Sequence, residues 1–231
     1  MKPGNFFILL LFLPSWVSAE SIPYPLEEIE RPLTLPTGMW EVGLGIAHVK
    51  WSQDNELFPL VSLRYGITDN LEFEPLGLRY RFFRNDQFQT SVRAALKAIG
   101  QSTSGGTLAL MEAGVDMRYR YSPKFAVLYT LEQRYYQYSK QSDIADLSIG
   151  IGPLIQLTER GALALNFSYR ELSGTEDSQG FLTKATFIWA LYPDLDLKFE
   201  GMYSDIQASG DFRYLGNMYK STVGTQIKWR F

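Results

Sequence analysis

Apolar and polar residues alternate one by one through most of this chain. Between positions 111 and 121 the odd positions carry Met, Ala, Val, Met, Tyr and Tyr, and the even ones Glu, Gly, Asp, Arg and Arg. Because side chains of an extended strand point alternately to opposite faces, the pattern predicts strands with one apolar and one polar face. We expect eleven such segments: 38–51, 56–67, 71–83, 87–99, 107–121, 125–138, 144–157, 161–171, 180–191, 194–204 and 217–231.

The connections between these segments alternate between two lengths. Short turns read YSPKF (121–125), LTERGAL (157–163) and YPDLD (192–196), and longer polar connections include SKQSD (139–143) and SGTEDSQG (173–180). Short turns at one end and longer loops at the other are typical of a transmembrane antiparallel up-and-down β-barrel. A soluble β-sandwich also alternates, but here the polar faces are rich in charge and glycine, and aromatic residues gather near segment ends. The pattern therefore favours the barrel.

The strand count is uncertain at one place. Single-chain bacterial barrels have even strand numbers, so eleven segments cannot be the final count. Near Pro75 the apolar phase jumps from Leu71 and Phe73 to Leu76 and Leu78, which indicates a bulge or a turn. Either 56–83 holds one strand fewer, giving ten, or a further short strand, for example from RPLTLPTG (31–38), gives twelve. We favour twelve.

The amino terminus has the organisation of an export signal. Lys2 precedes an apolar run over 6–13, Pro14 follows it, and small residues lead to Ala19. This run is too short for a membrane helix, which needs about 20 apolar residues. We therefore expect residues 1–19 to be a secretory signal peptide, 20–37 to be a periplasmic lead-in and 38–231 to be the barrel.

The last residues of the chain form an alternating aromatic ending. Val223, Thr225, Ile227, Trp229 and Phe231 fall on one face of the final segment. This ending resembles the C-terminal signature strand of Gram-negative outer-membrane β-barrel proteins. The resemblance implies recognition by the barrel-insertion machinery, a location in the cell outer membrane among its lipid and lipopolysaccharide, and periplasmic N- and C-termini.

Composition narrows the range of functions. The 231 residues carry a formal charge of −3, with one His and no Cys. A nearly neutral chain gives no reason to expect nucleic acid as a partner. The lack of cysteine excludes disulfides, thiolate metal sites and a thiol nucleophile. We predict no cofactor and no metal site.

Basic residues dominate the predicted inner face of the barrel. They are Arg64, Arg79, Arg81, Arg93, Lys97, Arg118, Arg120, Arg134, Arg170, Lys184, Lys198, Lys228 and Arg230. Rows of such charges in a narrow channel attract anions and repel cations, so we expect a small passive channel favouring small anionic solutes. The alternative is that these charges pair across adjacent strands and fill the lumen. The protein would then be a closed structural or adhesive barrel whose extracellular loops bind lipopolysaccharide or a protein.

Catalysis is the third class of function to weigh. An outer-membrane lipid hydrolase or acyltransferase needs a base near an activated nucleophile, and His48 lies close in sequence to Ser52 and Asp54. His48 shares the phase of lipid-facing Leu44 and Ile46, and no second histidine offers another base. The sequence therefore predicts a protein without enzyme activity.

Overall fold

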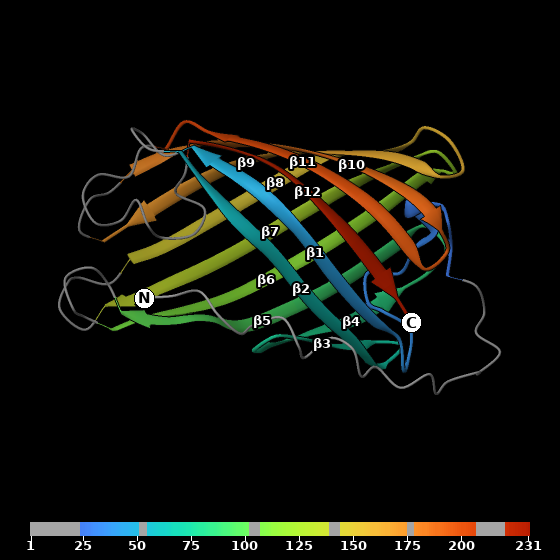
Figure 1. Ribbon diagram of the computed structural model, residues 1–231, viewed down its shortest axis with the longest axis horizontal. Helices are drawn as coiled ribbons and strands as arrows, with labels where there is room; N and C mark the ends of the chain where they lie inside the picture. Colours follow the sequence, from blue (N-terminus) through green and yellow to red (C-terminus); the bar gives the residue numbers. More distant parts are fainter. Residues whose placement is uncertain (1–23, 51–54, 102–106, 139–143, 175–177, 207–219) are drawn as a thin grey trace, which may run out of the picture.

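The strands of this chain close into a single antiparallel barrel (Figure 1). The computed structural model describes residues 24–50, 55–101, 107–138, 144–174, 178–206 and 220–231. It contains a 3-10 helix, η1 (Glu28–Glu30), and strands β1 (Trp40–Lys50), β2 (Asn55–Thr68), β3 (Leu71–Glu74), β4 (Gly77–Arg84), β5 (Phe88–Gln101), β6 (Thr107–Ser122), β7 (Phe125–Tyr138), β8 (Ile144–Gln156), β9 (Gly161–Ser173), β10 (Ser178–Tyr192), β11 (Leu195–Ser204) and β12 (Ser221–Arg230). In these residues no helix is long and apolar enough to cross a membrane. The predicted fold class and the favoured count of twelve strands are confirmed.

The twelfth strand arises at Pro75 and not before Met39. The predicted segment 71–83 is divided into β3 and β4, which pair with each other from Glu74 and Gly77 back to Leu71 and Tyr80. Pro75 and Leu76 form the tip of this hairpin, and Leu76 has a positive φ of 60°. The apolar phase jump near Pro75 is therefore a turn. The suggestion that 31–38 supplies the extra strand was wrong, because that stretch forms no strand.

The first and last strands seal the barrel. β1 and β12 pair without interruption from Glu41 and Arg230 to Lys50 and Ser221. Beyond Arg230, the main chains of Trp40 and Phe231 exchange both hydrogen bonds. The C-terminal strand is thus joined along its whole length to the start of the barrel.

The two ends of the barrel differ in their connections. One end, here called the turn end, holds the two chain positions Trp40 and Phe231 and the short turns 123–124, 157–160 and 193–194. The opposite end, at which β1, β5, β7, β9 and β11 finish, is called the loop end. Figure 1 shows η1 on the same side of the molecule as the C-terminus, which places it at the turn end.

The barrel is apolar outside and charged inside. Ile149 and Ile151 of β8 are exposed on the outer surface, and the alternate position Asp146 is buried inside. Glu41, Glu112 and Arg170 are likewise among the buried charged residues. A soluble protein has the opposite arrangement, whereas a barrel surrounded by lipid requires this one.

Candidate functional site: the charged interior and its N-terminal closure

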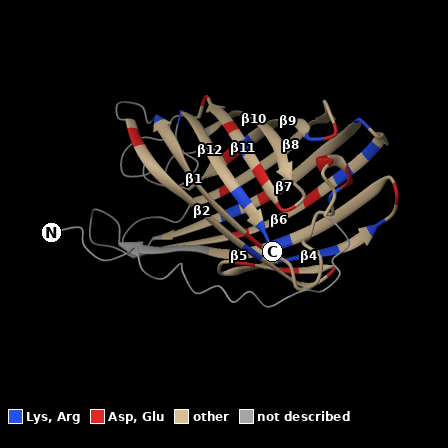
Figure 2. Cartoon of the chain, turned by 45° about the vertical axis from the view of Figure 1, so that its right-hand side comes forward, with Lys and Arg blue, Asp and Glu red and all other residues tan. Residues whose placement is uncertain are grey.

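Ion pairs run from strand to strand along the inner wall of the barrel. Arg93 on β5 binds Glu112 (Nε to Oε1, 3.0 Å) and Asp116 (Nη1 to Oδ2, 2.7 Å) on β6, and also contacts Glu132 on β7. Figure 2 shows that acidic and basic positions occur on neighbouring strands of the barrel. Since each guanidinium meets several carboxylates, the charges on this wall neutralise one another.

The same network continues onto the next strands. Asp146 on β8 accepts a hydrogen bond from Arg170 Nη2 at 2.6 Å and one from Arg134 Nη1 at 3.2 Å. Arg134 also reaches Glu112 at 3.3 Å. The side chains of Arg170 and Asp146 are 0% and 1% exposed, so their neighbours shield this ion pair from solvent.

A second cluster lies where the barrel is sealed. Glu41 on β1 contacts three cations: Lys228 at 2.9 Å, Arg230 at 2.8 Å and Arg64 at 3.2 Å. Arg64 also binds Glu72 at 2.6 Å. The cluster joins β12, β1, β2 and β3 through their side chains.

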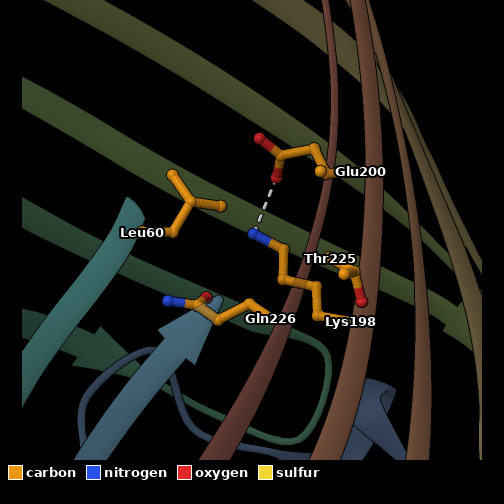
Figure 3. A pocket seen from close by; sticks show the side chains of 6 residues that line it. Leu60, Lys198, Glu200, Thr225 and Gln226 are labelled. Atoms are coloured by element: carbon orange, nitrogen blue, oxygen red, sulfur yellow. Dashed lines mark ion pairs between the residues drawn. The ribbon is translucent and has the colours of Figure 1, made fainter. Parts of the chain in front are cut away.

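A small pocket lies near the middle of the seal. Leu60, Lys198, Glu200, Gly224, Thr225 and Gln226 line it, and its volume is about 30 Å³. Figure 3 shows the Lys198 ammonium facing Glu200, with Leu60 and Gln226 on the other side. Lys198 and Lys184 both pair with Glu200, at 2.7 and 2.9 Å. The space admits only a few water molecules and no larger solute.

The segment before β1 packs into the turn end of the barrel. Within the N-terminal segment, defined as residues 24–37, Ile29 of η1 is 2% exposed and packs against Ala126, Leu154 and Ala162 of the inner wall. Leu35 is fully buried. The sequence indicated a periplasmic lead-in over 20–37, and in its described part apolar side chains leave water by entering the barrel. Positions 20–23 and the predicted signal peptide 1–19 lie outside the described residues.

Polar contacts from the wall hold the N-terminal segment. Arg31 donates two hydrogen bonds to Asp196, at 2.6 and 2.9 Å. The main-chain N–H of Leu35 donates to Glu72 at 2.8 Å, and Arg118 donates to the carbonyl oxygens of Glu28 and Arg31. The segment therefore exchanges its hydrogen bonds to water for bonds to the barrel.

The surroundings of the segment also shift the pKa values of two of its side chains, Arg31 and Tyr24. Burial would lower the pKa of Arg31, but the nearby carboxylates of Glu28 and Asp196 raise it above its ordinary value. Burial raises the pKa of Tyr24 to about 12, and the Arg230 guanidinium lies 4.6 Å from the centre of the Tyr24 ring. Both side chains keep their neutral-pH protonation states across the physiological range.

The structure allows the thirteen predicted basic residues to be placed one by one. Ten pair with carboxylates: Arg64, Arg79, Arg93, Arg120, Arg134, Arg170, Lys184, Lys198, Lys228 and Arg230. Arg81 donates instead to Asn70 Oδ1 and the Asp69 carbonyl oxygen, and Arg118 bonds to the N-terminal segment. The side chain of Lys97 lies outside the described residues. These residues come together as a paired network, the arrangement that the sequence left open as an alternative.

Two contributors to this site were not identified from the sequence. Glu72 and Glu74 on β3 supply inward carboxylates to Arg64 and Arg79, and the alternation with Leu71 and Phe73 could have indicated their direction. The N-terminal segment had a weaker signal, namely isolated apolar residues among prolines. Its burial inside the barrel depends on contacts distant in sequence.

The structure gives His48 no catalytic surroundings among the described residues. His48 is exposed and lies opposite Leu57 and Val223, on the outward face of the wall. Ser52 and Asp54, the other two members of the considered triad, lie outside the described residues. In the described part of the chain no three His, Cys, Asp or Glu residues are grouped as metal ligands.

Comparison with known proteins places the fold in a class. No family model and no curated protein matches the sequence. Among solved structures, the CymD monoaromatic hydrocarbon channel is 10% identical with a TM-score of 0.54, over 85% of this chain and 88% of that one. An outer-membrane channel from Pseudomonas putida F1 is 12% identical (TM-score 0.49, covering 86% and 97%), and OmpT of Vibrio cholerae is 8% identical (TM-score 0.46, covering 84% and 97%). The chain has the fold of outer-membrane β-barrels.

Proposed function

We propose that this protein is an outer-membrane β-barrel that acts as a small passive channel, closed at its turn end by the N-terminal segment. One observation carries the proposal: the segment fills the turn end, yet the barrel closes through β1 and β12 without it. The segment contributes no strand to the wall. Its release would therefore unblock this end and leave every wall ladder in place.

The width of a twelve-stranded barrel is compatible with conduction after such a release. Barrels of about 8 strands are filled by their own side chains, whereas those of 16 to 18 strands hold an aqueous channel. Twelve strands lie between these limits, so whether the lumen is open depends on what occupies it. Here Ile29, Arg31 and Leu35 occupy the turn end.

An anion preference follows from the basic side chains that lose their partners when the N-terminal segment is released. Among the described residues, Arg118 donates to carbonyl oxygens of the segment, and Arg120 pairs with Glu30 of the segment. After release of the segment, Glu72 still pairs with Arg64, and Asp196 still pairs with Arg230. The opened mouth thus gains two unpaired guanidinium groups, and small anionic solutes are favoured there.

A closed structural or adhesive barrel is the second candidate. The paired network around Arg93, Arg134 and Arg170 supports it, because charges that neutralise one another on the inner wall attract solutes only weakly. In that case the extracellular loops, with lipopolysaccharide or a protein as the ligand, would carry the function. Catalysis has no support from the position of His48, and we propose no enzyme activity and no cofactor.

The location and orientation are part of the same proposal. The aromatic ending from Val223 to Phe231 would serve as the signal for the barrel-insertion machinery, and the turn end, with both termini, would face the periplasm. Short turns on the periplasmic side are usual in such barrels. Residues 1–19 would be removed on export.

Single-channel recording separates the two candidates. The chain without residues 1–19 is refolded and compared in a planar bilayer with a variant that also lacks 20–37, under a salt gradient. We expect the longer form to be mostly silent and the shorter one to give discrete steps with an anion-favouring reversal potential. A folded shorter form that stays silent would contradict the channel and leave the closed barrel.

A matched pair of variants tests the source of selectivity. In the shortened form, Arg118→Gln with Arg120→Gln should move the reversal potential toward zero, because both cations lie at the opened mouth. Arg160→Gln removes a charge from the exposed turn outside the lumen and should leave it unchanged. Equal effects of both changes would contradict an anion site at the mouth.

A further inference from the structure

The wall of the barrel is incomplete between β2 and β5. β3 has four residues, and its ladder with β2 contains only the pairs Tyr65 with Phe73, Gly66 with Glu72 and Thr68 with Leu71. On its other side the hairpin reaches β5 only as far as Leu96, whose N–H donates to Leu76 at 2.8 Å. Residues 55–64 of β2 and 97–101 of β5 therefore have no ladder partner facing the hairpin within the described structure. We call this gap the notch.

The notch is too wide to be closed by direct pairing of its edges. At the level of the hairpin, three inter-strand spacings of about 4.8 Å separate β2 from β5, roughly 14 Å in all. Figure 1 shows the two strands moving apart from the hairpin toward the loop end. The edges of β2 and β5 consequently stay separate beyond Leu76.

Pro59 marks the free edge of β2 in the sequence. Proline has no N–H and is found in sheets at edges, where no partner needs that donor. Pro59 lies in the middle of the unpaired stretch, opposite Ile46 of β1. Every second residue of 55–64 directs its main-chain N–H and C=O groups away from β1 and into the notch. These groups need a hydrogen-bonding partner that the described chain does not supply.

The inner surface beside the notch is apolar. Toward the loop end from Glu41 and Arg64, the inward positions of β1 and β2 include Ala47, Val49 and Leu60, which pack together as a cluster. This is a sharp change from the paired charges deeper in the barrel.

The outer surface beside the notch is apolar as well. Leu57 and Val61 on β2 are 67% and 73% exposed, against 48% for Leu44 on the neighbouring, fully paired β1. Leu76, at the hairpin tip, is 62% exposed. Phe58 is at an inward position, opposite buried Ala47, and is still 38% exposed. The notch thus joins the apolar inner lining to the lipid-facing surface through the wall.

We propose that the notch is a lateral binding site and passage for small neutral amphiphiles, molecules with an apolar body and one hydrogen-bonding end. The apolar body lies against Phe58 and Leu60, and the polar end bonds to the free edge of β2. Charged solutes are disfavoured because the inner faces of β1 and β2 carry no charged side chain between Arg64 and Glu56. The nearby charges of Lys198 and Glu200, which line the pocket beside Leu60, are paired with each other at 2.7 Å. This site is independent of the turn-end closure and goes beyond the channel proposed above.

Spin labelling tests whether the inner surface at the notch meets lipid. The chain has no cysteine, so single labels are placed by Phe58→Cys at the notch, Ser148→Cys on the inner wall away from it and Ile149→Cys on the outer wall. In bilayers, collision with O2 relative to the water-soluble nickel chelate NiEDDA should be high at 58 and 149 and low at 148. If the O2-to-NiEDDA collision ratio at 58 is as low as that at 148, the proposal that the notch opens to lipid is overturned.

Binding tests the class of ligand. 1-Naphthol and naphthalene, which lacks the hydroxyl, are titrated calorimetrically into the full mature chain in nanodiscs, with empty nanodiscs subtracted. We expect saturable binding of 1-naphthol, at least five-fold weaker binding of naphthalene, and at least five-fold loss in Leu60→Gln but not in Leu182→Gln, an inward position elsewhere at the loop half. Equal loss in both variants, equal affinity for both compounds, or no saturable binding would overturn the proposal. None of these results depends on whether the shortened chain conducts.

Discussion

The pair of strands β1 and β2 has two very different neighbours. The ladder between β1 and β12 is complete, whereas the ladder between β2 and β3 is short. On one side, β1 and β12 share ten consecutive residue pairs, and Glu41 ties the strands together with three cations. On the other side, β2 shares only three pairs with β3, and proline and apolar residues replace charge. The first is a closed seam and the second an open one. Where a ladder is complete, buried charges can be paired across it; where it stops, no inward charge would find a partner.

This difference has an energetic reason. A buried charge is tolerated only with counter-charges held at hydrogen-bond distance, and a continuous ladder fixes those distances. Around the notch the neighbouring strand is missing, so a charged side chain would lack half of its surroundings. Apolar residues at the inward positions Phe58 and Leu60 need no such partner.

The largest expected effect comes from removing the acid at the closed seam. Glu41→Ala leaves Arg64, Lys228 and Arg230 without a shared carboxylate, and we expect unfolding free energy to fall by about 3–5 kcal/mol. The matched change at the open side, Glu56→Ala, removes an exposed carboxylate of β2 and should cost less than about 0.5 kcal/mol. Urea unfolding of the refolded protein in lipid vesicles measures both. Similar losses would mean that the two seams are not different in kind.

A smaller and opposite effect is expected at the hairpin tip that ends the ladder. Leu76 adopts φ of 60°, which disfavours any residue with a Cβ. Leu76→Gly should raise the free energy of unfolding by roughly 0.5–1 kcal/mol, the relieved strain less the greater freedom of glycine when unfolded. Leu78→Gly, two residues further in the extended β4, should lower it. Destabilisation by both changes would show that the tip is not strained.

The smallest effect concerns the response to acid of the Thr37–Asp69 clip, the pair of hydrogen bonds that ties the residues before β1 to the turn between β2 and β3. Asp69, in the turn before β3, accepts hydrogen bonds from the Thr37 N–H at 3.0 Å and hydroxyl at 2.8 Å, and these bonds lower its pKa. A depressed folded-state pKa contributes stability above the ordinary Asp pKa, and this contribution is lost as pH falls through the folded value.

Hydrogen exchange at the Thr37 amide measures how firmly the Thr37–Asp69 clip is held. Exchange at the Thr37 amide should be slow at pH 6 and faster, relative to the intrinsic rate, in acid below the ordinary pKa of an Asp carboxyl group. Asp69→Asn should be less protected at pH 6 and should lose the acid-dependent step. Retention of that step in the variant would assign it to other carboxylates.

Much of the fold followed from local pattern. The alternation of residues such as Ile149 with Ser148 determined which face of each strand is apolar, because the side-chain direction of a strand depends only on position parity. It also located the tight turns, and it indicated the irregularity at Pro75. The inward direction of Arg93 and Arg170 came from the same rule. The pattern did not determine whether the irregularity was a bulge or a turn.

The sequence by itself determined a barrel with an apolar outside and a charged inside. Only the tertiary structure decided that Arg93 meets Glu132 and that Arg31 meets Asp196, partners 39 and 165 residues apart. It also decided that the N-terminal segment enters the turn end and that residues 55–64 of β2 have no ladder partner toward β3 among the described residues. The alternation of side-chain direction is set by neighbouring residues in a strand. The ion pairs, the closure by the N-terminal segment and the unpaired edge depend on strand register and barrel closure, which bring distant parts of the chain together.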